Sequence, residues 1–175
     1  MGRNVAIIAW VLASAVYAAM MSWTLPTLST FAGGLPVFDM MPTGYSFAQA
    51  VELVNALGED GRAYYLRVQH KIDTVYPPLL GIAFALSFRL LFKGTVARSL
   101  VALAMVAAGL DLLENTAVAT MISTGAADLT AEMVAQASSL TIAKSALTTL
   151  AFMALLIGLG LWVWRRFSKR APRLA

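Results

Sequence analysis

Apolar residues fall into four long runs that are separated by more polar connections. The runs cover residues 5–25, 74–92, 99–122 and 140–164. Each run has about 20 residues, which as an α-helix rising ~1.5 Å per residue matches the ~30 Å hydrocarbon core of a bilayer. A helix satisfies its backbone polar groups within one segment, so the runs predict membrane-spanning helices. The expected fold class is all-α, an antiparallel bundle of four transmembrane helices.

The connection between the first two runs, residues 26–73, is too long to be a simple link. Its first part is rich in residues that interrupt helices and favour an extended or turning segment. These residues are Pro26, Gly33, Gly34, Pro36 and Pro42. The remainder carries apolar residues at helical spacing, so one or two short amphipathic helices are expected in this loop.

Local signals predict where these loop helices begin and end. Ser46 can cap the first helix, and Gly58 is a suitable C-terminal stop. Asp60 can cap a second helix that continues into the second span, where Pro77 and Pro78 are expected to start or kink the helix. The loop helices either lie on the membrane surface or form a lid over the mouth of the bundle.

Composition supports a membrane protein. Of the 175 residues, 59% are hydrophobic and 13% are charged, whereas about a quarter of a soluble domain is charged. The length suits one integral membrane domain, residues 1–175. The absence of cysteine excludes a disulfide framework, a thiolate metal site and a thiol nucleophile. The net charge of +4 does not indicate nucleic acid, because the basic residues flank the spans and form no patch with stacking aromatics.

Charge alternates between the connections and predicts the orientation. Basic residues without acidic neighbours precede the first run, link the second to the third and follow the fourth. They are Arg3, Arg89, Lys93, Arg98, Arg165, Arg166, Lys169, Arg170 and Arg173. The other two connections hold the acids Asp39, Glu52, Glu59, Asp60, Asp73, Asp128 and Glu132. The positive-inside rule therefore places both termini, including the basic tail 165–175, in the cytoplasm.

The N-terminus has a second interpretation as a cleaved signal peptide. Arg3 would be its basic flank, and Ala13, Ala15, Ala18 and Ala19 would be the small residues near the cleavage site. The apolar run is longer than the core of about 7–15 residues that such peptides contain. We therefore expect the first span to be retained.

Polar residues interrupt the third run at Asp111, Glu114 and Asn115. Spacings of three and four place these side chains on one helix face, and charged groups within a bilayer usually face a bundle interior. At ~1.5 Å per residue, both acids lie at the depth of Lys144 on the fourth run. The third and fourth runs share a short connection and are expected to be neighbours. The sequence thus predicts an ion pair between Lys144 and Asp111 or Glu114.

This cluster has a structural and a functional interpretation. A hydrogen-bonded triad can simply fix the register of the helices. However, one lysine cannot neutralise two carboxylates, so the second acid must be protonated, reach water or meet a ligand. A carboxyl in such a place can exchange a proton near neutral pH. Asp111 and Glu114 are therefore candidate catalytic residues, with Lys144 as counter-ion and Asn115 as an orienting partner.

Residues near the start of the second span can complete a binding site. Asp73 and Tyr76 open that span, and Arg62 and His70 lie just before it. With Asn115 and Lys144 they are the candidate ligand-binding residues, although a lone histidine at an interface is more often a solvated side chain. Carboxylates and an amide suit a hard cation, but the helical Glu-x-x-His pairs of di-iron bundles are missing, so no metal is predicted. The residues indicate no particular cofactor.

Four segments carry a family resemblance. They are MPTGYS at 41–46, ALGEDGRAYYL at 56–66, DTVYP at 73–77 and DLLEN at 111–115. Together they resemble small bacterial four-span integral membrane proteins of no known activity. The resemblance covers most of residues 40–116. It implies the four-span topology and a multi-pass location in the bacterial cytoplasmic (inner) membrane, and it implies no activity.

The sequence favours an outward-opening polar pocket that binds or modifies a lipid-like or small amphipathic molecule. As an alternative, the same acids can relay protons or cations, which requires a homo-oligomer because four short spans are a poor conduit. A third possibility is a non-catalytic accessory or assembly subunit with a membrane-protein partner. Membrane lipids are expected partners in all three cases, and the sequence does not decide whether a reaction is catalysed.

Overall fold

The computed structural model describes residues 2–168, and within them the chain is helical without strands. The four longest helices are α1 (Gly2–Ala19), α4 (His70–Leu91), α5 (Gly94–Thr124) and α6 (Ala131–Ser168). Between α1 and α4 lie α2 (Leu25–Phe31), a 3-10 turn (Phe38–Met40) and α3 (Phe47–Tyr64). Two π-helical segments join α1 to α2 and α3 to α4, at Met20–Thr24 and Tyr65–Gln69. Lys169, Arg170 and Arg173 of the predicted basic tail lie outside the described residues.

Four helical stretches are long and apolar enough to cross a membrane. They cover residues 2–31, 47–91, 94–124 and 131–168. The all-α class and the four helices able to span a bilayer, both predicted from the apolar runs, are confirmed. The chain thus has the character of a multi-pass membrane protein.

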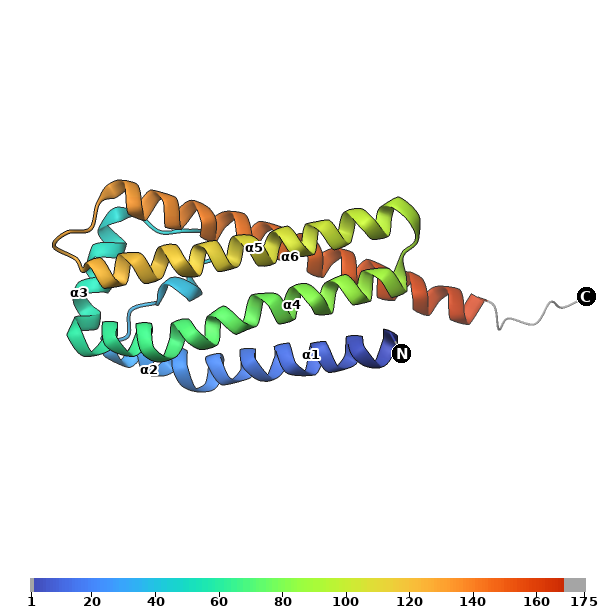
Figure 1. The fold of residues 1–175 in the computed structure, drawn as a ribbon, viewed down its shortest axis with the longest axis horizontal. Coiled ribbons are helices and arrows are strands. Elements are labelled where there is room, and N and C mark those ends of the chain that lie inside the picture. Colours follow the sequence, from blue (N-terminus) through green and yellow to red (C-terminus); the bar gives the residue numbers. More distant parts are fainter. Residues whose placement is uncertain (1, 169–175) are drawn as a thin grey trace, which may run out of the picture.

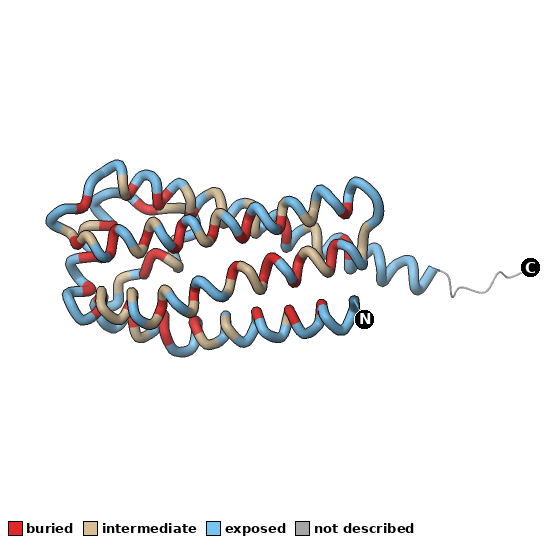
Figure 2. The backbone as a smooth tube through the Cα atoms, in the orientation of Figure 1, coloured by how far each residue is buried: buried red, intermediate tan, exposed pale blue. Residues whose placement is uncertain are grey.

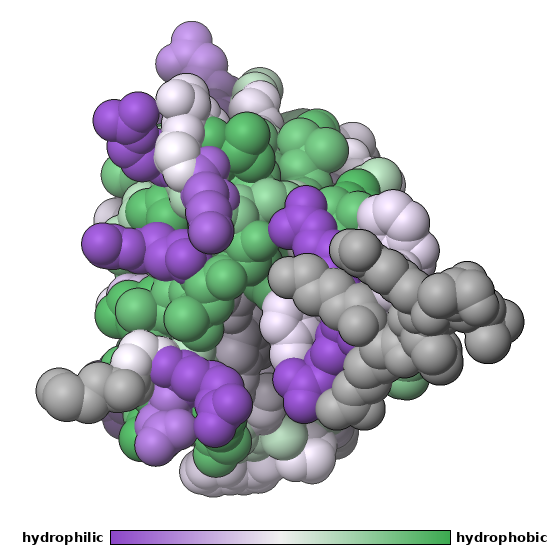
Figure 3. Space-filling model, turned by 90° about the vertical axis from the view of Figure 1, so that its right-hand side faces the viewer, coloured by the Kyte–Doolittle hydropathy of each residue, from purple (hydrophilic) through white to green (hydrophobic). Residues whose placement is uncertain are grey.

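The long helices lie side by side, and each runs opposite to the one before it in the chain (Figure 1). One end of the molecule carries α2, α3 and the connection between α5 and α6, and we call it the capped end. The other end carries the N-terminus and the connection between α4 and α5, and we call it the terminal end. Figure 3 views the terminal end, where hydrophilic side chains gather around a hydrophobic surface.

The helices extend beyond the apolar runs. α4 begins at His70 rather than near residue 74, and α6 begins at Ala131 rather than near residue 140. Pro77 and Pro78 therefore lie inside α4 and do not start it. The difference has a physical reason, because hydropathy marks the length of chain suited to lipid whereas a helix ends where its capping and packing end.

The segment between α1 and α4 forms the cap. Ser46 accepts a hydrogen bond from the Gln49 backbone, and the Gln49 side chain completes a reciprocal capping box. Gly58, with φ 61° and ψ −167°, interrupts α3 at the position expected for a stop. The residues after Gly58 continue through the π-helical segment into α4. The second loop helix and the second span are therefore one continuous rod.

The bundle is open along one side. α1 packs on α4, α4 on α5 and α5 on α6, but no comparable interface joins α1 to α6 within residues 2–168. Small residues allow the closest approach between α4 and α5, since a Cβ added at Gly81 would lie 2.9 Å from Cβ of Ala108. Buried positions line the inside of the helices and exposed positions the outside (Figure 2). The exposed outside includes many large apolar side chains, as a lipid environment requires.

Two apolar cores lie on either side of a polar level. The core toward the capped end includes Val118 of α5 and Ala137 of α6, and the core toward the terminal end includes Ala104 of α5 and Ala151 of α6. Asp111 and Lys144 fall between these positions on their helices. The fold therefore surrounds the predicted polar cluster with apolar packing above and below.

Candidate functional site

Lys144 of α6 pairs with both acids of α5. Its Nζ lies 2.6 Å from Oδ1 of Asp111 and 3.0 Å from Oε2 of Glu114. The short connection after Thr124 makes α5 and α6 antiparallel neighbours, so side chains of equal depth meet. The ion pair predicted from helix spacing is confirmed, and it includes both carboxylates.

Glu114 is held at both of its oxygens. Thr141, which lies on the same face of α6 as Lys144, donates a hydrogen bond of 2.7 Å to Oε1, while Lys144 donates to Oε2. The Glu114 side chain is only 2% exposed. A carboxylate with these partners is well placed to join α5 to α6 and poorly placed to exchange a proton with a ligand.

Asn115 forms a hydrogen bond that is explained by the presence of Pro77 in α4. Its Nδ2 donates a hydrogen bond of 3.1 Å to the backbone carbonyl of Asp73. In a regular helix this carbonyl accepts from the backbone N–H four residues later, but that residue is Pro77 and proline has no N–H. Within a membrane a freed backbone group needs a substitute partner. Asn115 therefore completes the hydrogen bonding of α4 rather than the coordination of a ligand.

A cavity of about 310 Å³ lies beside the ion pair, and it is partly open to the surface. Its polar lining comes from α1, the 3-10 turn, α4, α5 and α6. The polar residues are Tyr17, Asp39, Asp73, Tyr76, Asp111 and Lys144. Four of the predicted site residues, Asp73, Tyr76, Asp111 and Lys144, are thus brought together, whereas Glu114 and Asn115 lie behind them.

The cavity contains carboxyl oxygens that nothing on the described chain satisfies. Asp73 is 3% exposed, and its Oδ2 and the Oδ2 of Asp39 are buried without a hydrogen-bond partner among residues 2–168. Both side chains line the same cavity. A carboxylate oxygen only accepts hydrogen bonds, so each of these oxygens needs a donor from outside the described chain. These two oxygens are therefore the acceptors of the cavity that are left for a ligand's hydrogen-bond donors.

Tyr45 supports the turn that brings Asp39 to the cavity. Its backbone N–H donates to Oγ of Ser138 at 2.9 Å, and its ring centre lies 4.6 Å from that of Phe38, the neighbour of Asp39. Burial raises the pKa of the Tyr45 hydroxyl above its ordinary value, and this effect outweighs the opposing effect of Thr141; the negative charges of Glu114 and Asp39 raise the pKa further. Tyr45 therefore remains a neutral hydroxyl beside the acids.

Arg62 and His70, which were predicted at the mouth of the site, are not among the residues that line this cavity. The Nε of Arg62 donates to the carbonyl of Gly58 at 3.2 Å. Its guanidinium packs over Gly125, in the connection between α5 and α6. The His70 ring stacks on Tyr65, with ring centres 6.4 Å apart. Both side chains belong to the packing of the cap, because the π-helical segment and the break at Gly58 set the faces of this rod.

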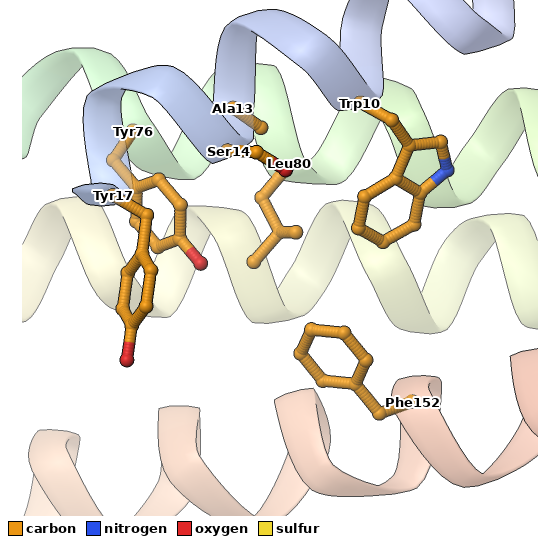
Figure 4. A pocket seen from close by; sticks show the side chains of 7 residues that line it. All are labelled: Trp10, Ala13, Ser14, Tyr17, Tyr76, Leu80 and Phe152. Atoms are coloured by element: carbon orange, nitrogen blue, oxygen red, sulfur yellow. The ribbon is translucent and has the colours of Figure 1, made fainter.

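An apolar groove continues from the cavity along the open side of the bundle. It has a volume of about 370 Å³ and lies between Trp10 and Ser14 of α1, Leu80 of α4 and Phe152 of α6. Figure 4 shows Phe152 facing the α1 side chains across the groove. Tyr17 and Tyr76, whose ring centres are 5.7 Å apart, line both the groove and the cavity. Trp10 is fixed there by a hydrogen bond of 2.9 Å from its Nε1 to Oγ of Ser87.

Sequence reasoning missed Asp39 and Tyr17 as lining residues. Asp39 stands among apolar residues in the segment VFDMM at 37–41, and an acid in such a setting is a signal of a buried position. Tyr17 carries no comparable signal, because an aromatic residue near the end of a span is equally suited to the lipid interface.

The site does not resemble a metal centre or a described family. Among the residues that the structure describes, no group of three or more histidine, cysteine or acidic side chains is arranged to hold a metal ion. Comparison of the chain with protein-family models, with curated proteins and with solved structures found no match.

Proposed function

We propose that this protein is an antiparallel four-span bundle of the bacterial cytoplasmic membrane that binds a lipid-like molecule. The polar end of the ligand occupies the cavity beside Asp111 and Lys144, and its apolar part lies in the groove between α1 and α6. Both termini are cytoplasmic, and the capped end faces outward. The continuity of a polar cavity with an apolar groove, through Tyr17 and Tyr76, carries this proposal.

The open side of the bundle suits a ligand that enters from the membrane. The groove follows the α1–α6 side, where the two helices share no extended interface in residues 2–168. A lipid can therefore reach the cavity laterally, with its chain kept out of water. Ligand pockets of this type combine a mostly apolar lining with a few placed polar groups.

Binding is a better fit than a chemical step at Glu114. Both Glu114 oxygens already accept hydrogen bonds, and Lys144 holds Oδ1 of Asp111. The ion pair thus supports the wall of the cavity, and Asp73 and Asp39 offer the free acceptors. This assignment gives Asp111 and Lys144 a lining role and Glu114 and Asn115 a supporting role.

A proton or cation relay through one chain has less support. Such a relay needs polar groups on both sides of the membrane midplane. The core between the polar level and the terminal end is instead apolar in the described chain, with Leu80, Phe84, Phe88, Ala104 and Ala151. Conduction would therefore require a path between copies in an oligomer.

The test is lipid retention in native membrane. The protein is extracted with its surrounding lipid, purified, and analysed by mass spectrometry for molecules that stay bound at a constant ratio. Ser14→Trp places a large side chain in the groove at an exposed position of α1, and Ala15→Trp is the control, because Ala15 is exposed but does not line the groove.

We expect the wild type and Ala15→Trp to retain the same lipid-like molecule and Ser14→Trp to lose it. If both variants retain the molecule equally, the proposal is refuted. A protein partner at a constant ratio, in place of a small molecule, would favour the accessory-subunit role instead.

A further inference from the structure

We propose that the ligand's polar end is a cationic amine, held between the carboxyls of Asp39 and Asp73. This inference rests on the proposed function and names the headgroup class. It applies to any amphiphile that combines a protonated amine with an apolar chain.

The balance of charge in the cavity favours a cation. Asp39, Asp73 and Asp111 line it, whereas Lys144 is the one cationic side chain in its lining within residues 2–168. Lys144 is also shared with Glu114. Three carboxyl side chains therefore face one shared ammonium group, and this excess of acidic groups in a low-dielectric site favours a positively charged ligand.

The unfulfilled hydrogen bonds require donors. The Oδ2 atoms of Asp39 and Asp73 are buried acceptors without partners in the described chain. Asp73 is 3% exposed and lines the cavity, so its free oxygen takes its donor from whatever occupies the cavity. An ammonium group supplies three N–H donors and a positive charge together, and hydrogen bonds between charged groups are stronger than neutral ones.

Other headgroups match the cavity less well. A phosphate or carboxylate would bring acceptors and negative charge to side chains that are already acceptors and acidic. A hydroxyl could donate one hydrogen bond but would leave the charge uncompensated. The amine is therefore the group that meets both needs.

The position of the aromatic rings agrees with this placement. Tyr17 and Tyr76 stand where the cavity meets the groove. Aromatic faces attract cations. The edges and hydroxyls of the two tyrosines would lie between the polar end of the ligand and its apolar chain. An amine beyond these rings would sit at Asp39 and Asp73, while its chain would follow Leu80 and Phe152.

Binding of three amphiphiles with one common saturated chain tests the inference. They end in a primary ammonium, a primary alcohol and a carboxylate, and their binding to the detergent-solubilised protein is measured by native mass spectrometry. We expect the ammonium compound to bind at least about tenfold more tightly than the alcohol, since charge-assisted hydrogen bonds are worth more than neutral ones. The carboxylate should bind most weakly.

Asp73→Asn should remove most of this preference while keeping the shape of the side chain. Asp39→Asn is the second variant, because Asp39 is only half-buried in a short turn and tolerates the change more easily. Asp128→Asn removes one acid from an exposed connection and should leave the preference unchanged. Thermal unfolding of each variant shows whether it is folded.

The outcomes separate this inference from the proposed function. If all three headgroups bind equally and Ser14→Trp still blocks their binding, the preference for an amine is refuted and the lipid site is retained. Binding that Ser14→Trp does not affect would overturn both. An ammonium preference that survives both Asp73→Asn and Asp39→Asn would also refute the assignment of these two acids.

Discussion

Asn115 and Pro77 are partners across the interface between α4 and α5. Pro77 removes a backbone donor from α4, and the amide of Asn115 supplies a replacement 3.1 Å from the exposed carbonyl of Asp73. This hydrogen bond satisfies the carbonyl that Pro77 would otherwise leave without a donor inside α4. It also fixes the backbone of Asp73, whose side chain faces the cavity.

The partnership predicts a specific rescue. Asn115→Ala should destabilise the protein by about 1–3 kcal/mol, because the Asp73 carbonyl becomes an unsatisfied buried acceptor. Pro77→Ala restores the backbone N–H and should recover much of this loss in the double variant. Unfolding by sodium dodecyl sulfate in mixed micelles measures both effects.

Pro78→Ala is the matched control for this rescue. Pro78→Ala restores an N–H that faces the carbonyl of Thr74. Asn115 contacts the preceding carbonyl, that of Asp73. If Pro78→Ala rescues Asn115→Ala as well as Pro77→Ala does, the pairing of Asn115 with Pro77 is not the cause of the stability.

At the scale of helices, α4 and α5 meet through small residues. Gly81 faces Ala108 so closely that an added Cβ would lie 2.9 Å from the alanine Cβ. Gly109 is next to Ala108 in sequence, but a Cβ added there would meet no atom within 4 Å other than its own helix backbone and chain neighbours. The two glycines therefore differ in what surrounds them although both lie in apolar helices.

This difference predicts that the same substitution costs more stability at Gly81 than at Gly109. Gly81→Val should force α4 and α5 apart and cost about 1–3 kcal/mol, the usual penalty for overpacking. Gly109→Val, on the lipid-facing side, should change stability by less than about 1 kcal/mol. Thermal unfolding in detergent provides the comparison, and similar losses for both variants would contradict the packing described for Gly81.

The sequence predicts that these helices exist better than it predicts where each one begins and ends. The four apolar runs predict four spanning helices, and four helices long and apolar enough to cross a membrane are present. Their limits are less predictable, since α4 and α6 begin several residues earlier than the apolar runs. Ser46 and Gly58 are exceptions, because an N-cap side chain and a glycine with positive φ are local features that the sequence displays directly.

For the whole molecule, the placement of charge predicts an orientation in the membrane. The connection between α4 and α5 carries Lys93 without acids, and the connection between α5 and α6 carries Asp128. These connections lie at the terminal and capped ends respectively (Figure 1). The positive-inside rule therefore predicts that the terminal end lies in the cytoplasm.

The chain contains no cysteine, so single cysteines can report this orientation without background. Asp128→Cys should react with a membrane-impermeant maleimide in intact cells. Lys93→Cys should react only after the membrane is permeabilised. Both positions are exposed, and the reverse pattern would show that the capped end faces the cytoplasm.

The sequence by itself determined the all-helical class, the four spans and the meeting of Lys144 with Asp111 and Glu114, because hydropathy and helical spacing are local and periodic. Only the tertiary structure decided that Asp39 joins Asp73, that Arg62 and His70 lie elsewhere, and that the cavity continues into a groove. These features depend on the path of the irregular segment 32–46 and on which helix faces pack together. Such long-range contacts arise from the whole fold, and no local pattern records them.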